Sequence, residues 1–432
     1  MKFQPPKGTR DFLPEEMIKR GFVINAIKNV FVKYGFEELQ TPVFEDWSLL
    51  TEKCGEDIKN QIFRFKDKSD RELGLRFDLT VPMARVVASN PQLPKPFKRY
   101  AIAPAWRYEE VTAGRKREFY QCDIDVVGSS SMEADVECIA AAVDCLIALG
   151  FKNFDIVVNN RKILDGFIEL IKADKKKGVD IFRAVDKIGK FGEEVVREEL
   201  TKAGLDDEQT KKLMELISEK GNFKKTLEQG KKLLKGIPVG EEGLKEMEEL
   251  FEFGKIYGID KMLILDFSLA RGIDYYTGPI FEIRNKTGEK IGSVTGGGRY
   301  DNLIELLGGR PTPATGISLG IERIVEIMKE NKMFNLPKTN VKVFVADVKA
   351  KKYAVKIAQE LRKNGISCQT DLMNRNLTKQ LEFADSLGIQ YVLIVGEKEI
   401  KSKKFKLRDM QKKTEKEMEL KKIITLLNRN YK

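Results

Sequence analysis

The sequence predicts an α/β (α+β) protein in which an antiparallel-sheet domain, interrupted by helices, is followed by a small α/β domain. Strand patterns occur at 97–128 and return at 262–285, whereas residues 161–258 have a charge-laced helical pattern without a strong strand signal. From residue 341 onward strands and helices alternate, which is typical of a mainly parallel sheet. We therefore divide the chain into segments 1–160, 161–258, 259–334 and 335–432.

The first segment is expected to begin with an amphipathic helix over residues 14–34. Pro14 suits the first turn of this helix, and the acidic Glu15 and Glu16 suit the positive end of the helix dipole. Gly35 follows the last apolar residue of the pattern and suits a helix end.

Four strand patterns follow this helix. Residues 36–46 predict an extended segment, and residues 73–79 predict a strand that runs into a helix. Residues 97–110 and 116–128 predict two strands joined by a polar turn around 112–115.

The strand at 116–128 alternates between a polar and an apolar face. Gln121, Asp123 and Asp125 lie on one face, because side chains two residues apart share a face of a strand. Two aspartates and a glutamine would make a poor core surface, since buried polar groups need partners. This face therefore predicts the lining of a polar pocket.

The remaining elements complete the two domains. We expect a helix at 132–149, a strand at 154–160, and a small-residue strand from 314 that runs into a helix ending near 331. Residues 335–340 form a plausible linker to the last domain.

The 432 residues include no histidine. The length predicts two or three domains, and 42% hydrophobic with 33% charged residues is typical of a globular protein. The absence of histidine excludes Ser-His-Asp and Cys-His catalysis, an imidazole general base and zinc sites with histidine ligands. Charge stabilisation by arginine and a metal ion remains open.

The five cysteines form no CxxC pair, and Cys138 and Cys145 lie seven residues apart in an apolar helical pattern. This usage predicts core thiols, a reducing cytoplasmic location and no structural zinc. The N-terminus has no apolar signal segment, and no stretch has the length and apolarity of a membrane span. We therefore expect no membrane association.

The net charge of +11 is concentrated in the last domain. Residues 338–432 hold 23 Lys+Arg against 11 Asp+Glu, whereas residues 1–337 hold 54 against 55. A basic excess confined to one domain is typical of nucleic-acid contact. A Lys-rich solvated surface is the alternative interpretation.

Residues 99–125, RYAIAPAWRYEEVTAGRKREFYQCDID, place an arginine at a strand end before acidic residues and a basic turn. A guanidinium fork there suits a phosphate oxygen and a carboxylate oxygen at once. The segment resembles motif 2 of the class II aminoacyl-tRNA synthetases, and in particular of the histidyl-tRNA synthetases. The resemblance assigns Arg107 to the α-phosphate and the attacking carboxylate, and Glu109 to the nucleotide.

Three further segments resemble the same family. Gln40-Thr41-Pro42 with the preceding helix resembles motif 1, which implies a homodimer. LARGIDYYTG at 269–278 resembles an element specific to histidyl-tRNA synthetases, and GISLGIERI at 316–324 resembles motif 3. The resemblance places Arg271 on the α-phosphate and Arg323 on the γ-phosphate, where the start of a helix already favours anions.

An imidazole needs a hydrogen-bond acceptor near one ring nitrogen and a second polar group near the other. The resemblance assigns Asp125 and Tyr276 to these two nitrogens, with Tyr275 in the amino-acid pocket. It assigns Asp78, Thr80 and Gln121, together with Leu79 of the Asp-Leu-Thr element, to the α-ammonium side. The implied histidine-binding set is Asp78, Leu79, Thr80, Arg107, Gln121, Asp125, Arg271, Tyr275 and Tyr276.

The resemblance implies a class II antiparallel-sheet catalytic domain with a helical insertion and a C-terminal α/β anticodon-binding domain. Its expected activity is ATP-dependent ligation of L-histidine to tRNA(His) through histidyl-adenylate, with release of AMP and pyrophosphate. Arg107, Arg271 and Arg323 are the expected catalytic residues, and with Glu109 they form the ATP-binding set. Mg²⁺ is expected to bridge the ATP phosphates, with no metal ligand assigned among the protein side chains.

Two alternatives remain open from the sequence. One is a non-catalytic, synthetase-like histidine sensor such as a regulatory subunit of ATP phosphoribosyltransferase. The three arginines and the basic last domain argue against it, since such sensors usually lack that domain. The other is a different class II specificity, such as threonine or proline, which the RGIDYYTG and Asp-Leu-Thr elements disfavour.

Overall fold

The computed structural model describes residues 3–52, 56–112, 115–188, 192–271, 275–286 and 293–429. It forms two compact units: residues 1–10 with 22–333, and residues 11–21 with 334–432. Each unit is described by itself. No helix among the described residues is long and apolar enough to cross a membrane.

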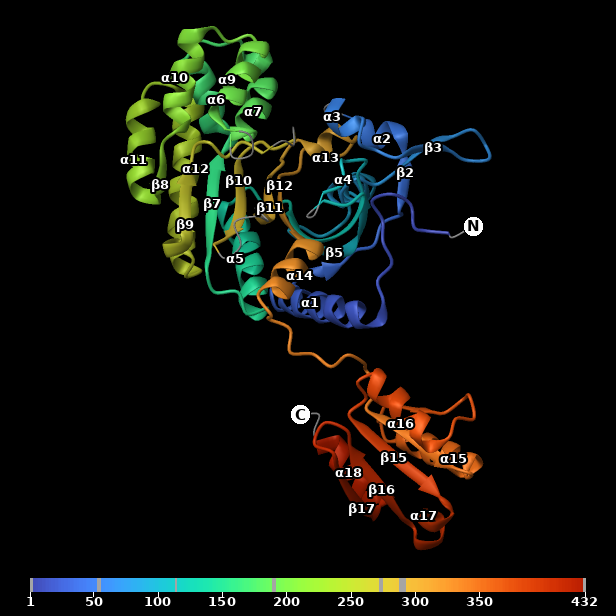
Figure 1. The fold of residues 1–432 in the computed structure, drawn as a ribbon. Helices are drawn as coiled ribbons and strands as arrows, with labels where there is room; N and C mark the ends of the chain where they lie inside the picture. The colour runs from blue at the N-terminus through green and yellow to red at the C-terminus, as the bar shows by residue number, and fades with distance from the viewer. Residues whose placement is uncertain are drawn as a thin grey trace. The chain divides into compact units, whose positions relative to one another are not determined.

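A nine-stranded sheet forms the centre of the first unit, in the order β1-β5-β6-β12-β11-β10-β7-β9-β8 (Figure 1). The strands from β5 to β7 in this order are all antiparallel, whereas β1–β5 and β7–β9 pair in parallel. The bounds are β1 Glu37–Glu38, β5 Phe97–Trp106, β6 Glu118–Val127, β7 Phe154–Asn160, β8 Lys220–Asn222, β9 Leu263–Asp266, β10 Pro279–Asn285, β11 Ser293–Arg299 and β12 Ala314–Gly320. The predicted antiparallel sheet is confirmed.

Helices cover both faces of this sheet. Helix α5 (Met132–Ala148) packs on β6, β10, β11 and β12, and an ion pair between Asp135 and Arg299 fastens it to β11. On the opposite face, α4 (Thr80–Ser89) and α13 (Leu303–Leu306) bury an apolar cluster that includes Met83, Val127 and Ala314. Helix α14 (Ile321–Glu330) follows β12 directly and contacts β6.

The N-terminal elements differ in detail from the expectation. Helix α1 spans Pro14–Lys33, close to the predicted 14–34. The predicted extended segment at 36–46 divides between two sheets: β1 joins the large sheet, and β2 (Phe44–Asp46) joins a three-stranded sheet of order β2-β4-β3. The other members are β3 (Arg64–Lys66) and β4 (Glu72–Leu75), and α2 (Trp47–Thr51) and α3 (Glu56–Lys59) lie between β2 and β3.

The segment 161–258 is mainly helical, as its sequence pattern predicts. Its helices are α6 Arg161–Leu170, η1 Lys175–Lys177, α7 Gly178–Asp186, α9 Glu193–Lys202, α10 Asp207–Ile217, α11 Phe223–Leu233 and α12 Pro238–Ile256, and η2 (Asp260–Met262) follows. The expectation of no strand was incomplete, because β8 lies in this segment and pairs with β9 at the sheet edge. Its Lys-Gly-Asn sequence has no apolar alternation, so only tertiary pairing defines it.

The second unit contains a five-stranded sheet of order β14-β13-β15-β16-β17. Strands β14, β13 and β15 are parallel, as predicted, but β16 and β17 form an antiparallel hairpin. The bounds are β13 Val343–Val348, α15 Lys351–Lys363, β14 Cys368–Thr370, α16 Leu377–Ser386, β15 Tyr391–Gly396, α17 Glu397–Ser402, β16 Lys404–Asp409, β17 Thr414–Glu419 and α18 Leu420–Arg429. Its core lies on both sides of β13 and β15.

Candidate functional site

The polar face of β6 forms the floor of the site, as its alternation predicts. The strand register aligns Asp125 with Arg99 of β5 and Gly316 of β12. One step along, Asp123 lies between Ala101 and Ser318. The next step places Gln121 between Ala103 and Gly320. Since directly paired residues share a face of the sheet, Gln121 and Asp123 stand among small neighbours, and Asp125 stands between Arg99 and a glycine.

The Asp-Leu-Thr element lies at the start of α4, beside this floor. Asp78 Oδ1 accepts hydrogen bonds from the backbone N–H groups of Thr80 (3.2 Å) and Val81 (3.0 Å). Asp78 Oδ2 is buried without a hydrogen-bond partner. Burial raises the pKa of Asp78 above its usual value. Leu79 contributes its backbone carbonyl, which accepts from Arg99 Nη2 at 3.0 Å.

Gln121 and Asp123 meet at Ser318. Gln121 Nε2 donates to Ser318 Oγ at 2.9 Å, and Ser318 also shares a side-chain hydrogen bond with Asp123. Gln121 Oε1 and Asp123 Oδ1 are buried and have no hydrogen-bond partner. These two free acceptors belong to residues that are 9% and 3% exposed.

Asp125 contacts two buried residues, Arg99 and Tyr300, to which the resemblance assigns no role. Arg99 Nη2 forms an ion pair with Asp125 Oδ2 at 2.6 Å, and Tyr300 Oη donates to Asp125 Oδ1. All three side chains are buried. A Cβ on Gly316 would overlap Asp125 Oδ1, so glycine is required there. The sequence places Arg99 and Asp125 in two neighbouring predicted strands, and this pattern indicates an ion pair between the strands.

The two tyrosines of the LARGIDYYTG element close one side of the pocket. Tyr275 packs edge-on against Tyr276 and Tyr300, with ring centroids 5.1 and 5.6 Å away, and shares a side-chain hydrogen bond with Thr80. Tyr276 is 8% exposed and lies against Gly298. Residues 272–274 of this element lie outside the described residues.

The guanidinium of Arg271 lies directly over Gly296 of β11. Its backbone is in the left-handed region with φ of 52°, which is uncommon for a non-glycine residue. Nη1 lies 3.2 Å from Glu282 Oε1, and the guanidinium carbon lies 5.9 Å from the centroid of the Tyr276 ring. The side chain is 18% exposed, so the guanidinium borders the pocket from within the protein.

Arg107 follows the end of β5. Its Nε donates to the Phe77 carbonyl at 3.0 Å, and its guanidinium carbon lies 5.2 Å from the centroid of the Phe119 ring. Nη1 lies 4.0 Å from Glu109 Oε1, and Glu109 Oε2 lies 3.5 Å from Arg115 Nη1. Residues 113–114 of the predicted turn lie outside the described residues.

Arg323 lies in the first turn of α14, where backbone N–H groups without partners inside the helix favour anions. Its Nη1 donates to the Ser293 carbonyl. Burial, followed by the positive charge of Arg115, lowers the pKa of Arg323, and Arg271 contributes in the same direction. Arg115 and Arg271 therefore both repel the charge of Arg323, and a polyanion would relieve this repulsion.

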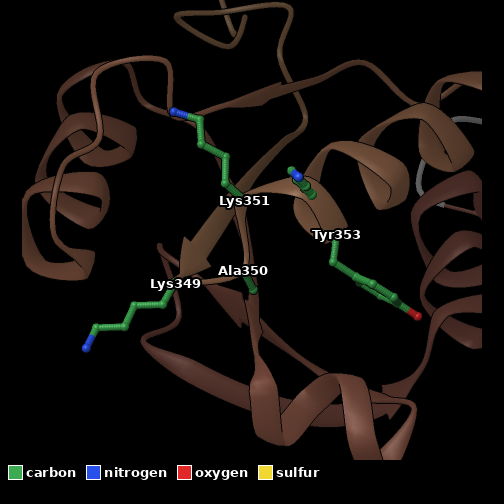
Figure 2. Close-up of a pocket in the computed structure, with 5 residues that line it drawn as sticks. Lys349, Ala350, Lys351 and Tyr353 are labelled. Carbon is green, nitrogen blue, oxygen red and sulfur yellow. The ribbon is translucent and has the colours of Figure 1, made fainter.

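The second unit carries a basic pocket where β13 ends and α15 begins. Figure 2 shows Lys349, Lys351 and Tyr353 projecting from this turn. Lys349 has a left-handed φ of 53°, and Lys351 Nζ lies 2.5 Å from Asn374 Oδ1. Tyr353 stacks on Phe405 with an interplanar angle of 23°. Cations beside an exposed aromatic ring are typical of single-stranded nucleic-acid contacts.

The family model described as histidyl-tRNA synthetase matches residues 8–324. The chain belongs to the histidyl-tRNA synthetase family. A second model, described as an anticodon binding domain, matches residues 337–430. The predicted family and fold class are therefore confirmed, and the expected enzyme class, histidine–tRNA ligase, is confirmed as well.

Named relatives of this synthetase family match over most of their length. The chain is 44% identical to a histidine–tRNA ligase of Aeropyrum pernix over 405 residues, covering 92% of this chain and 91% of the relative. It is 38% identical to that of Thermococcus kodakarensis, with 98% of both chains covered. A histidyl-tRNA synthetase structure from a Nostoc species superposes with a TM-score of 0.84 at 29% identity, and both chains are covered completely.

A fourth comparison concerns the regulatory-subunit alternative. A Bacillus halodurans structure titled as an ATP phosphoribosyltransferase regulatory subunit/histidyl-tRNA synthetase superposes with a TM-score of 0.77 at 23% identity. At that identity the likeness concerns the fold of the synthetase family alone. The high-coverage ligase relatives do not favour the regulatory alternative.

Proposed function

We propose that the chain activates L-histidine with ATP and transfers the histidyl group to tRNA(His), releasing AMP and pyrophosphate. The observation that supports this proposal most is that one site combines buried hydrogen-bond acceptors with several arginines. Buried acceptors on β6 and before α4 suit a cationic amino acid, and Arg107, Arg271 and Arg323 border them and suit a polyphosphate.

In the first step a histidine carboxylate oxygen attacks the α-phosphorus of ATP. The new phosphorus–oxygen bond forms as the bond to the pyrophosphate leaving group breaks. No proton has to be removed from the attacking carboxylate, which agrees with a chain that contains no histidine. Catalysis then depends on positioning and on stabilising negative charge.

We assign this charge stabilisation to the three arginines. Arg107, whose Nη1 is 4.0 Å from Glu109, contacts the α-phosphate and the attacking carboxylate. Arg271 neutralises the α-phosphate from the opposite side, and Arg323 binds the γ-phosphate. In the second step a terminal ribose hydroxyl of tRNA attacks the histidyl carbonyl, the bond to the AMP phosphate breaks, and the hydroxyl proton passes to a phosphate oxygen of the departing AMP.

We also propose that Mg²⁺ binds together with ATP, at the phosphates. Among the described residues no group of three or more acidic or cysteine side chains is arranged to hold a metal ion. The nearest carboxylate to Arg271, Glu282, is shared between Arg271 and Arg284. Hard phosphate oxygens are the ligands that Mg²⁺ prefers, so we expect ATP to supply most of the ligands of the ion.

We also propose that the chain acts as a homodimer in the cytoplasm. Val32 of α1 is 57% exposed and Phe44 of β2 is 51% exposed, which supports an apolar contact near the motif 1 resemblance. Cys138, Cys145 and Cys368 are buried free thiols, which fits a reducing compartment. Light scattering of the purified protein tests the dimer.

Exchange of radioactive pyrophosphate into ATP tests the amino-acid specificity. We expect exchange with histidine and none with threonine or proline. Tight histidine binding without exchange would instead favour a histidine sensor. Exchange driven by another amino acid would contradict the proposed specificity.

A further inference from the structure

We propose that Asp123, absent from the histidine-binding set expected from the sequence, is an acceptor for the α-ammonium group of the bound amino acid. This inference rests on the proposed function, because it concerns the amino-acid subsite of the same reaction. It assigns Asp123 a specificity-determining role beside Asp78 and Gln121.

The position of Asp123 in the sheet supports this role. Its neighbours on β5 and β12 are Ala101 and Ser318, both with small side chains. Beyond Ser318 the same row continues with Gly296. The carboxylate of Asp123 therefore stands in a row of small residues, and the guanidinium of Arg271 lies over Gly296 in the same row.

Ser318 orients the groups on either side of it. Because Gln121 Nε2 donates to Ser318 Oγ at 2.9 Å, the carbonyl end of the Gln121 amide is the end left for another donor. The hydrogen bond that Ser318 shares with Asp123 fixes this carboxylate as well. One serine thus holds two acceptors in place before a ligand arrives.

Four buried acceptor atoms at this site lack a hydrogen-bond partner: Asp78 Oδ2, Gln121 Oε1, Asp123 Oδ1 and Asp125 Oδ2. Of these, Asp125 Oδ2 already forms an ion pair with Arg99 Nη2. An ammonium group presents three N–H donors. Unsatisfied buried acceptors are unfavourable, and charged ones more so, so this subsite favours a ligand with matching donors. Asp125 does not offer the same opportunity, because Arg99 and Tyr300 already contact its two oxygens.

The local charge also favours a cation. Asp123 is buried with Asp78 and Asp125, and the nearest cation, Arg99, is paired with Asp125. Burial raises the pKa of Asp123 to about 7, with Arg99 opposing the shift and Asp125 adding to it. The other charged or titratable groups that interact with Asp123 are Asp78, Arg76 and Tyr276. An ammonium group next to Asp123 would favour its ionised form.

The test compares histidinol with its analogue that lacks the amino group, 3-(imidazol-4-yl)propan-1-ol, by calorimetric titration of the full chain. In the unmodified protein we expect histidinol to bind at least tenfold more tightly. In Asp123→Asn this preference should fall by about 10-fold or more, since a hydrogen bond to a charged group contributes about 1.5–3 kcal/mol. Affinity for the analogue should change little. Asp207→Asn, an exposed acid on α10, is the matched control and should keep the full preference.

Proton release gives a second measurement on the same samples. Because the ligand favours ionised Asp123, histidinol binding near pH 7 should release more protons from the unmodified protein than from Asp123→Asn. Titration in two buffers with different ionisation enthalpies measures this difference, and the imidazole of histidinol contributes to both proteins. Ser318→Ala, which leaves Asp123 in place, should lower the preference for the amino group several-fold and covers the case in which Asp123→Asn does not fold.

The outcomes separate this inference from the proposed function. An unchanged preference in both Asp123→Asn and Ser318→Ala would overturn the role of Asp123. Equal loss of affinity for both ligands would do so too, because it indicates a contact with the ring or a structural role. If the unmodified protein showed no pyrophosphate exchange with histidine, the proposed function itself would fall, and this inference with it.

Discussion

The guanidinium of Arg271 occupies the space that a side chain on Gly296 would fill. A Cβ built on Gly296 would overlap Nη1 of Arg271 and would lie 2.6 Å from its central carbon. The two residues come from different parts of the chain, and the left-handed backbone of Arg271 brings its side chain across β11. The absence of a side chain at Gly296 therefore makes room for Arg271, to which we assign a catalytic role.

Gly296→Ala should displace Arg271 and slow the adenylation step. The added carbon would overlap Nη1 and would lie 2.6 and 2.8 Å from the central carbon and Nη2, so the whole guanidinium has to leave its position. We expect a loss of about 10²-fold in single-turnover adenylation, the usual cost of removing one group that stabilises developing charge. Gly21→Ala, where no atom lies within 4 Å of the added carbon, is the control. Equal rates in both variants would show that Arg271 does not need this space.

Arg271→Ala should abolish adenylation while histidine binding largely survives. Arg271 borders the pocket beside Glu282, whereas the buried acceptors for the amino acid belong to β6 and the segment before α4. We expect a loss of at least about 10²–10³-fold in rate. Rapid-quench adenylation and calorimetric titration with histidine measure the two properties. A normal adenylation rate would remove Arg271 from its proposed role.

The double variant Lys349→Gln/Lys351→Gln should weaken tRNA charging without changing pyrophosphate exchange. Both lysines line the basic pocket of the second unit, and loss of phosphate contacts lowers affinity and its dependence on salt. The double variant Lys412→Gln/Lys413→Gln is a matched control, because Lys413 shares the left-handed backbone of Lys349. Aminoacylation kinetics at two salt concentrations measure the loss of tRNA affinity and the change in its salt dependence. Equal losses in both pairs would indicate a general charge effect only.

Asp123→Asn should stabilise the ligand-free protein at alkaline pH. The folded protein raises the pKa of this acid from 3.8 to about 7, so the folded state binds the proton more tightly than the unfolded state. Stability therefore falls as pH rises from about 4 to about 7, and the full cost remains above that range. Near pH 8 the variant should gain about 1–3 kcal/mol, and near pH 4 it should gain almost nothing.

Thermal unfolding of the unit that contains Asp123, followed at both pH values, measures this effect. The Asp207→Asn variant serves as the control, because Asp207 lies exposed in the first turn of α10. A variant that is destabilised near pH 8 would show that ionised Asp123 makes a net favourable contact in the empty site.

Much of the fold follows from local patterns. Apolar periodicity predicted α1, α5 and the long strands β5 and β6 to within a few residues. The strands β8 and β17 and the antiparallel pairing of β16 were not predicted, because pairing with neighbours defines β8 and β17 more than their own alternation does. The predicted extended segment at 36–46 was divided between two sheets for the same reason.

The sequence by itself determined the family, the order of the segments and the polar face of β6. Those features depend on residue type and spacing, which are fixed along the chain. Only the tertiary structure decided which polar atoms on that face are already paired. Arg99 and Tyr300, distant from Asp125 in sequence, engage its carboxylate, whereas Asp123 keeps a free oxygen among small neighbours. Hydrogen-bond satisfaction depends on contacts between strands, so the alternation that placed both aspartates together could not distinguish their roles.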